Sequence, residues 1–381
     1  MKKLSYLKNK LHILFINSWY PSKVLPVNGD FIQRHAEAVA LKHKVTALHV
    51  ITDKNLKTNS IVEEQLINNV NTIIKYCKTT SNPFVKYIQF FKAYLELIKR
   101  VKNYDVVHLN RIYPAGLIVL YLKWFKKKPY IISEHWTGYQ DGLKPLQFLE
   151  KFISKLITKN AIFVCPVSKN LTKSMLNLSL KGNYTTVPNV VNTDIFVPED
   201  HNNEIFTMLH VSSMVDKHKN ISGILEVAAD LKKVIPNFKL YLIGNSASTY
   251  NYLIDTLNIA ENVILTDQIA HTDIAKYMQQ SDLFILFSNY ENLPCVILES
   301  FSCGLPVIST NVGGISEYFP ETYGTLIKKN DKSELLKSIV TYYYSDRIPS
   351  KAEMHTYAND NFSPEIICSK FSDLYYKTLI Q

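Results

Sequence analysis

The feature that most constrains this chain is the alternation of short apolar runs with longer segments of helical periodicity. Several runs are apolar at nearly every position, which is typical of parallel strands buried on both faces of a sheet. Parallel strands need crossover connections, usually helices, between them. The alternation therefore predicts doubly wound α/β domains. The expected strands span residues 11–17, 44–50, 105–110, 129–135, 162–168, 205–213, 239–244, 262–267, 283–288, 306–310 and 325–329.

The segment 187–204, VPNVVNTDIFVPEDHNNE, interrupts this alternation and is rich in Pro, Asn and Asp. The charge changes sign at the same place. Residues 1–190 carry 29 Lys and Arg against 10 Asp and Glu, and residues 191–381 carry 14 against 23. Both features predict a linker. We expect two Rossmann-like domains, residues 1–188 and 189–381, facing across a cleft that binds ligands at the carboxyl ends of the strands. The last helix, about 362–381, could pack back on the first domain.

Several classes of protein are disfavoured by simple patterns. The five cysteines form no CxxC pair, which argues for a reducing compartment and against a disulfide framework or structural zinc. The beginning, MKKLSYLKNKLHILFIN, is predicted to form a first strand rather than a signal peptide, because its apolar run is short and no small-residue cleavage site follows. No uncharged apolar run reaches 18 residues. No G-x-G-x-x-G motif supports a dinucleotide oxidoreductase. We expect a cytoplasmic protein.

Two strand ends in the first half could carry chemistry. Gly29 begins a predicted helix after the loop that follows the first strand, so backbone could approach a phosphate at the helix N-terminus. A simple turn glycine with Asp30 as N-cap explains the same pattern. In ISEHWTGY, a strand delivers His135 and Trp136. His135 could donate to a hydroxyl or assist proton movement near neutral pH, and Trp136 offers an apolar face to a sugar ring or lipid. A purely structural histidine is the alternative.

In the second half, Lys217, His218 and Lys219 precede a helix predicted to begin near Asn220. Helix N-termini usually favour acidic side chains, so cations there indicate an anionic ligand. A solvated basic loop is the other interpretation.

The stretch NYENLPCVILESFSCGLPVIST, residues 289–310, holds two glutamates in an otherwise apolar context. A strand should end at Ser288 and the next helix should end at Gly304, which places Glu291 at a strand's carboxyl end and Glu299 inside a buried helix. A buried carboxylate needs hydrogen-bond donors, and ligand hydroxyls would serve. The backbone N–H groups of Cys295 and Val296 could meet phosphate at the helix start.

This E-x₇-E block, followed by SFSCGLPVIST and NVGGISE, resembles the donor-site motif of retaining glycosyltransferases of family 4, which have the GT-B fold. The segments SWYPS…NGDFIQRHAEAVA, SEHW, PVSKNL, VPNVVNTDIF and the KN after HVSS follow the family's order and spacing. The resemblance covers residues 11 to about 340. It implies metal-independent transfer from a UDP- or GDP-sugar, which is a substrate, with no cofactor.

The resemblance also implies roles for individual residues. Glu299 would accept hydrogen bonds from the ribose, and Glu291 would contact the transferred sugar, as nucleophile or as stabiliser. Lys219 would pair with the diphosphate, which Gly29 would approach from the other domain, and His135 would touch the donor sugar. Further predicted donor contacts are Cys295, Val296, Leu293, Lys217 and Ile269, and predicted acceptor contacts are Trp136, Trp19 and Tyr20.

The chain departs from the family pattern at three places. Ser213 occupies a position where the family usually has Arg, which leaves Lys217 or His218 to contact phosphate. Pro294 replaces a frequent Gly and removes one backbone N–H. The segment IGNSAS, residues 243–248, lacks the second glycine of the usual turn.

The basic first half should bind a glycan or lipid-linked acceptor. Its residues 84–102, FVKYIQFFKAYLELIKRVK, interleave aromatic and aliphatic residues with Lys and Arg, and the cluster KWFKKKPY at 123–130 adds further basic residues. This helix could lie on an anionic leaflet, such as the cytoplasmic face of the inner membrane. Alternatively, it is an ordinary amphipathic helix packed on the sheet.

Two other functions compete with glycosyl transfer. A nucleotide-sugar epimerase of GT-B fold would consume its substrate without an acceptor. A nucleic-acid-binding protein is suggested by the pI of about 9.1, but no recognised module with exposed aromatic residues appears, and the second half is acidic. We therefore expect no nucleic-acid partner.

Overall fold

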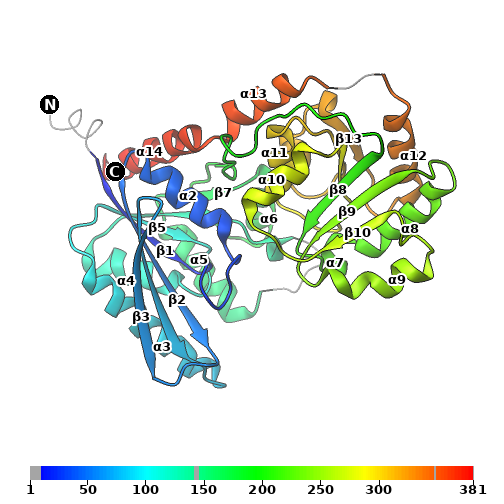
Figure 1. Ribbon diagram of the computed structural model, residues 1–381. Helices are drawn as coiled ribbons and strands as arrows, with labels where there is room; N and C mark the ends of the chain where they lie inside the picture. Colours follow the sequence, from blue (N-terminus) through cyan, green and yellow to red (C-terminus); the bar gives the residue numbers. More distant parts are fainter. Residues whose placement is uncertain (1–9, 141–145, 347–348, 381) are drawn as a thin grey trace. The chain divides into compact units, whose positions relative to one another are not determined.

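The computed structural model describes residues 10–140, 146–346 and 349–380, which form two compact units (Figure 1). The first unit contains the described residues up to Val190 together with those from Pro364 onward, and the second runs from Val191 to Ser363. The last helix, α14 (Pro364–Ile380), is thus part of the first unit. Residues 1–9, the basic beginning of the segment that was predicted to form the first strand, lie outside the described residues.

The first unit is built on a seven-stranded sheet with the order β3-β4-β2-β1-β5-β6-β7. All neighbouring strands are parallel except β3 and β4. The strands are β1 (His12–Asn17), β2 (Lys44–Asp53), β3 (Ser60–Ile67), β4 (Val70–Lys78), β5 (Val106–Asn110), β6 (Tyr130–Glu134) and β7 (Phe163–Pro166). The connecting helices are α2 (Asp30–Ala40), α3 (Pro83–Arg100), α4 (Gly116–Lys126), α5 (Phe148–Asn160) and α6 (Lys169–Asn177).

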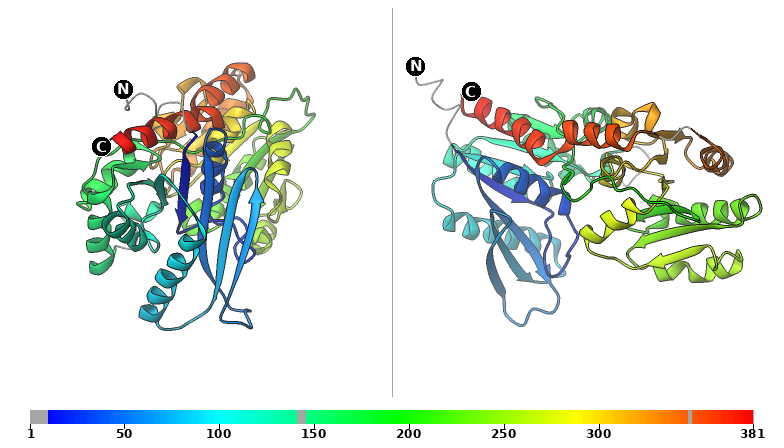
Figure 2. Two further views of the ribbon diagram at one scale, coloured as in Figure 1. Left: turned by 90° about the vertical axis from the view of Figure 1, so that its left-hand side faces the viewer. Right: turned by 45° about the horizontal axis from the view of Figure 1, so that its top comes forward.

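Strand order reverses direction at β1, so right-handed crossovers put the helices on both faces of the sheet. Helices α3, α4 and α5 contact one another in sequence and form one layer. Helix α14 lies alongside α2 on the other face, which Figure 2 shows as red and dark blue helices side by side. Phe371 and Tyr375 of α14 are fully buried in the core of this unit. Burying two such side chains stabilises the docked helix by about 3–6 kcal/mol.

The hairpin β3–β4 was not predicted from the sequence. Its strand β3 is mostly exposed and polar, so it lacks the apolar run by which the buried strands are recognised. The available signal was Asn68-Asn69, which forms the two-residue turn with φ of 47° and 64°. Paired left-handed residues are typical of tight hairpin turns, and asparagine adopts them readily.

The second unit is built on a parallel six-stranded sheet with the order β10-β9-β8-β11-β12-β13. Its strands are β8 (Phe206–Ser212), β9 (Phe238–Gly244), β10 (Val263–Thr266), β11 (Leu283–Leu286), β12 (Val307–Thr310) and β13 (Gly324–Ile327). Its helices are α7 (Asp216–Lys219), α8 (Ile221–Lys232), α9 (Asn251–Thr256), α10 (His271–Gln279), α11 (Cys295–Ser302), α12 (Lys332–Tyr343) and α13 (Lys351–Phe362). The prediction of doubly wound α/β domains is confirmed for both units.

Candidate functional site

The loop between β11 and α11 brings Glu291 to the carboxyl edge of the second sheet. Lys219, the last residue of α7, donates its Nζ hydrogen bond to Glu291 Oε1. Ser288 Oγ donates to the same carboxylate oxygen at 2.7 Å. The side chain of Lys219 is 17% exposed and that of Glu291 is 8% exposed. Because little water screens the two charges, the attraction between them is stronger than at the surface. The ion pair therefore fixes the position of both groups.

A glycine of the NVGGISE segment holds this loop in place. Gly313 has φ of 63°, and a Cβ atom there would lie 1.8 Å from the carbonyl oxygen of Glu291. The adjacent Gly314 donates its backbone N–H to Asn292 O at 2.7 Å. Only a residue without a side chain allows the two segments to approach this closely.

Glu299 lies in α11, where only 1% of its surface is exposed. His271, the first residue of α10, makes a 2.9 Å hydrogen bond through Nε2 to Glu299 Oε1. The His271 ring also packs against Phe196, with 4.8 Å between ring centroids. The protein thus supplies a donor that the sequence argument had assigned to ligand hydroxyls. Nothing in the sequence indicated that His271 would reach this carboxylate from another segment.

The other predicted donor contacts of the second unit are distributed around this pair. Cys295 and Val296 form the first turn of α11 and are partly exposed, whereas Leu293 is buried. Lys217 is exposed on α7, and its carbonyl accepts a hydrogen bond from Asn289 Nδ2 at 3.2 Å. Ile269 is partly buried in the loop between β10 and α10.

In the first unit, Gly29 brings two backbone segments together. Gly29, with φ of 80°, is the N-cap of α2, and a Cβ atom there would lie 2.8 Å from the carbonyl carbon of Trp19. The alternative with Asp30 as N-cap is wrong, because Asp30 is already the first helical residue. The close packing of the Trp19 backbone explains why glycine is required here.

Glu134 joins the ends of β5 and β6. Its fully buried carboxylate accepts hydrogen bonds from the backbone N–H groups of Ile112, His135 and Trp136, at 2.9–3.0 Å. The hydroxyl of Tyr139 donates a fourth hydrogen bond, at 3.1 Å. Such a carboxylate fixes backbone rather than offering itself to a ligand.

His135 is largely buried at the same edge, beside the rings of Phe31 at 4.7 Å and His35 at 5.3 Å. Burial, followed by the charges that His35 and His108 would carry, lowers the pKa of His135 well below its usual value. The imidazole is therefore neutral at neutral pH. It can exchange hydrogen bonds with a hydroxyl, but it is a poorer proton carrier than the sequence suggested.

The three predicted acceptor residues are not equivalent. The guanidinium of Arg111 lies 3.7 Å from the ring centroid of Trp19 and 5.0 Å from that of Trp136. Tyr20, in contrast, is buried in the core of the unit and packs near His49. Arg111 was missed by the sequence argument. The signal was its position immediately after a buried strand, where parallel sheets present functional side chains.

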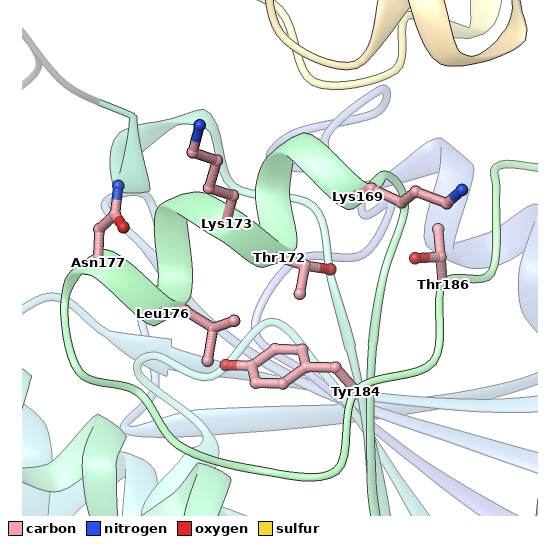
Figure 3. Close-up of a pocket in the computed structure, with 7 residues that line it drawn as sticks. All are labelled: Lys169, Thr172, Lys173, Leu176, Asn177, Tyr184 and Thr186. Carbon is pink, nitrogen blue, oxygen red and sulfur yellow. The ribbon is translucent and has the colours of Figure 1, made fainter.

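The first unit also contains a pocket of about 440 Å³ beside α6, shown in Figure 3. Its lining includes two amines, three hydroxyls, an amide and an aromatic ring, and it contains no residue predicted from the sequence. Lys169 and Thr186 lie at one end of the labelled group, and Asn177 lies at the other. The lining residues are Lys169, Thr172, Lys173, Leu176, Asn177, Tyr184 and Thr186.

Two family models match consecutive parts of the chain. The model described as Glycosyltransferase Family 4 matches residues 34–195, and the model described as Glycosyl transferases group 1 matches residues 192–360. The sequence is 25% identical to an uncharacterized glycosyltransferase of Methanocaldococcus jannaschii, over 84% of this chain and 86% of the relative. It is 22% identical to an alpha-monoglucosyldiacylglycerol synthase of Acholeplasma laidlawii, over 66% and 70%.

Solved structures resemble the fold over nearly the whole chain. Sucrose-phosphate synthase from Thermosynechococcus elongatus matches with a TM-score of 0.79 and 19% identity, covering 97% of this chain and all of that one. The Anabaena protein HepE in complex with UDP-glucose matches with a TM-score of 0.73 and 16% identity, covering 97% and 100%. At these identities the likeness concerns the fold.

Proposed function

The chain belongs to the family 4 glycosyltransferases of GT-B fold, and from that membership we propose that it transfers a sugar with retention of anomeric configuration. The donor is a UDP- or GDP-sugar, and the acceptor is a hydroxyl of a cell-surface glycan or lipid-linked saccharide. The bond from the anomeric carbon to the diphosphate oxygen breaks as the acceptor oxygen bonds to the same face. The acceptor proton passes to the departing diphosphate, without a metal ion.

The observation that carries this proposal is the pairing of Lys219 with Glu291 at the carboxyl edge of the second sheet. The anomeric carbon gains positive charge in the transition state, which the Glu291 carboxylate would stabilise. The diphosphate gains negative charge, which Lys219 and the N-terminus of α11 at Cys295 and Val296 would stabilise. A cation and an anion held side by side match the two charges that separate during the reaction.

The other residues of the two sheet edges are proposed to contact the donor or the acceptor. Glu299, oriented by His271, accepts hydrogen bonds from the ribose, while Leu293, Lys217 and Ile269 contribute donor contacts. In the first unit, Gly29 approaches the diphosphate and neutral His135 bonds a hydroxyl of the donor sugar. Trp19 and Trp136 contact the acceptor, and we omit Tyr20 because it is buried in the core.

A thermal-shift screen with UDP, GDP and their sugars tests donor binding, because a ligand of the folded state raises the melting temperature. NMR of the slow hydrolysis of the selected donor then identifies the first sugar anomer released, before mutarotation. Retention predicts an α-sugar from an α-linked donor. Release of the β-anomer would contradict retention, and a nucleotide-sugar with inverted ring stereochemistry would favour the epimerase.

We also propose that the first unit attaches peripherally to an anionic membrane. No helix in the described part of the chain is long and apolar enough to cross a bilayer. Helix α3 is partly anchored in the protein, since Ala93, Tyr94 and Leu97 are buried, but Phe84 in its first turn is 72% exposed. The sequence alternative of a helix packed on the sheet therefore describes its second half.

Helix α5, in the same layer, has the more complete amphipathic surface. Phe148 is 88% exposed, and Leu149 and Phe152 are also exposed. Lys151, Lys155 and Lys159 recur every four residues beside this apolar stripe. Apolar side chains flanked by a row of lysines favour insertion at the headgroups of an anionic leaflet. The alpha-monoglucosyldiacylglycerol synthase named above is consistent with a lipid-linked acceptor.

Flotation with liposomes tests this attachment. We expect binding to vesicles of phosphatidylcholine with phosphatidylglycerol at low salt, and weaker binding at high salt or without the anionic lipid. The double variant Phe148→Ser/Phe152→Ser should bind at least tenfold more weakly. Tyr252→Ser is the matched control, because Tyr252 is 82% exposed on the second unit. Absence of binding to anionic vesicles at low salt would contradict the proposal.

A further inference from the structure

Arg111 lies at the carboxyl end of β5 in a backbone conformation that is uncommon for its residue type. Its φ is 62°, in the left-handed region that arginine seldom adopts. The conformation is fixed from both sides, since Arg111 N donates to Ser133 O at 2.9 Å and Ser18 Oγ donates to Arg111 O at 2.9 Å. Unfavourable backbone conformations that the surrounding structure enforces are concentrated at functional sites.

Two tryptophan rings hold the side chain of Arg111. Its guanidinium carbon lies 3.7 Å from the centroid of Trp19 and 5.0 Å from that of Trp136. Cation–π contacts of this kind stabilise the cation through the ring faces. They do not use the N–H groups, which lie in the plane of the guanidinium and remain available as donors.

The N–H groups of Arg111 find no acceptor within the described residues. Its Nε is buried without a hydrogen-bond partner there, and its side chain forms no ion pair closer than 4.0 Å among the same residues. Glu134 is the carboxylate whose charge acts most strongly on Arg111, but its oxygens already accept four hydrogen bonds from Ile112, His135, Trp136 and Tyr139. Burial lowers the pKa of Arg111, and the charge of Glu134 opposes this effect.

A solely structural role explains this arrangement poorly. Trp19 and Trp136 could be packed equally well by a neutral side chain, which would avoid the desolvation of a guanidinium. Arg111 is partly buried, and a partly desolvated cation whose buried Nε has no acceptor is costly unless a ligand supplies one. The guanidinium fork matches two oxygens of a carboxylate or a phosphate, and arginine serves this purpose better than lysine.

We propose that Arg111, between Trp19 and Trp136, binds an oxyanion carried by the acceptor saccharide. This inference rests on the proposed glycosyl transfer, in which the same two tryptophans contact the acceptor. It narrows the acceptor class to saccharides that bear a phosphate or a carboxylate, such as phosphate-linked glycans or uronic acids. The two rings then contact the sugar that carries the anion, as aromatic faces do for apolar ring surfaces.

The three tryptophans of the chain make this binding measurable without a transfer assay. In the full-length protein labelled with ¹⁵N-tryptophan, the indole N–H signals of Trp19 and Trp136 report on the site. Trp124, exposed at the end of α4, is the internal control. We titrate with glucose 6-phosphate, glucuronate and neutral glucose at low salt, and assign the signals with single Trp→Phe variants.

We expect one of the two anionic probes to shift the signals of Trp19 and Trp136 but not that of Trp124, and glucose to bind at least tenfold more weakly. Arg111→Gln should weaken the anionic probe at least tenfold, and Arg111→Lys, which keeps the charge but loses the fork, by an intermediate factor. A preference for glucose 6-phosphate identifies a phosphate-bearing acceptor, and a preference for glucuronate identifies a uronic acid.

Equal binding of glucose and of both anions to the wild-type protein would overturn the proposal, as would a folded Arg111→Gln variant with unchanged affinity. If Arg111→Gln does not fold, the comparison of anionic with neutral probes in the wild-type protein still tests whether the site binds an oxyanion. The readout is independent of sugar transfer. An active enzyme without anion binding would refute this site alone, and anion binding by an enzyme without transfer activity would refute only the proposed function.

Discussion

At the carboxyl edge of the second sheet, Lys219 is paired with Glu291, whereas at the edge of the first sheet Arg111 lies between two aromatic rings. The second unit thus satisfies its charged groups internally, and breaking such a little-exposed pair costs about 3–5 kcal/mol. The first unit holds a cation whose buried Nε has no acceptor among the described residues. Under the proposed function, the paired edge would stabilise charges that appear only during reaction, and the edge with Arg111 would receive a charge already present on a ligand.

Glu291→Gln should have the largest effect, because the amide keeps the shape of the side chain but removes its charge. We expect sugar transfer to fall by about 10²–10³-fold, the magnitude typical for loss of an electrostatic stabiliser. The uncompensated charge of Lys219 should also lower the melting temperature. Glu226→Gln is the control, since Glu226 pairs with Lys332 in an exposed position and should lose neither activity nor stability. Near-normal sugar transfer by Glu291→Gln would show that the carboxylate of Glu291 does not stabilise the transition state.

Glu299→Gln should have a smaller effect, which separates the two carboxylates of the E-x₇-E block. Its amide can still bond to His271, but it accepts fewer hydrogen bonds from a ribose. We expect the Kd of the nucleotide to rise about tenfold, equivalent to about 1.4 kcal/mol, with little change in kcat. Calorimetric titration and steady-state kinetics measure the two quantities. A loss of kcat as large as that of Glu291→Gln would show that the two glutamates act as one group.

The contrast between the two edges also explains how far the sequence could be interpreted. Elements with a strong local signal were predicted correctly, such as the short helix α11 and the turn at Gly304, where φ is 69°. The strand expected to end at Ser288 was also found, but it ends two residues earlier, at Leu286. The polar strand β3 was not predicted from the sequence, because it is stabilised by pairing with β4 rather than by burial of apolar side chains.

Contacts between distant segments could not be obtained from spacing. The bond from His271 to Glu299 joins two helices, and the arrangement of Arg111 with Trp19 and Trp136 joins three loops that follow β1, β5 and β6. Each requires the strand order of the sheet, which periodicity does not provide. The resemblance to a family supplied the roles of Glu291 and Glu299, but it gave no indication of Arg111.

The smallest effect per residue is expected from acid, and its sum should differ between the two units. Burial lowers the pKa of His35 and of His49 in the first unit to about 4, and it does the same for His210 in the second. The first unit also buries His108 and His135, whose pKa values lie well below the usual one. Because the folded-state pKa is depressed, the neutral ring is favoured in the native state. This stabilisation is fully present above the unfolded pKa of 6.5 and is lost as the pH falls toward 4.

Lowering the pH from 7 to 5.5 should therefore cost about 1 kcal/mol for each fully buried histidine, with a larger sum in the first unit. Hydrogen exchange followed by mass spectrometry can compare peptides of β1 and β2 with peptides of β8 and β9, after correction for the intrinsic pH dependence of exchange. His49→Gln should flatten the response of the first unit by about the contribution of one histidine, and His210→Gln should flatten only that of the second. Equal acid sensitivity of both sets of peptides would mean that the excess of buried histidines does not govern the stability of the first unit.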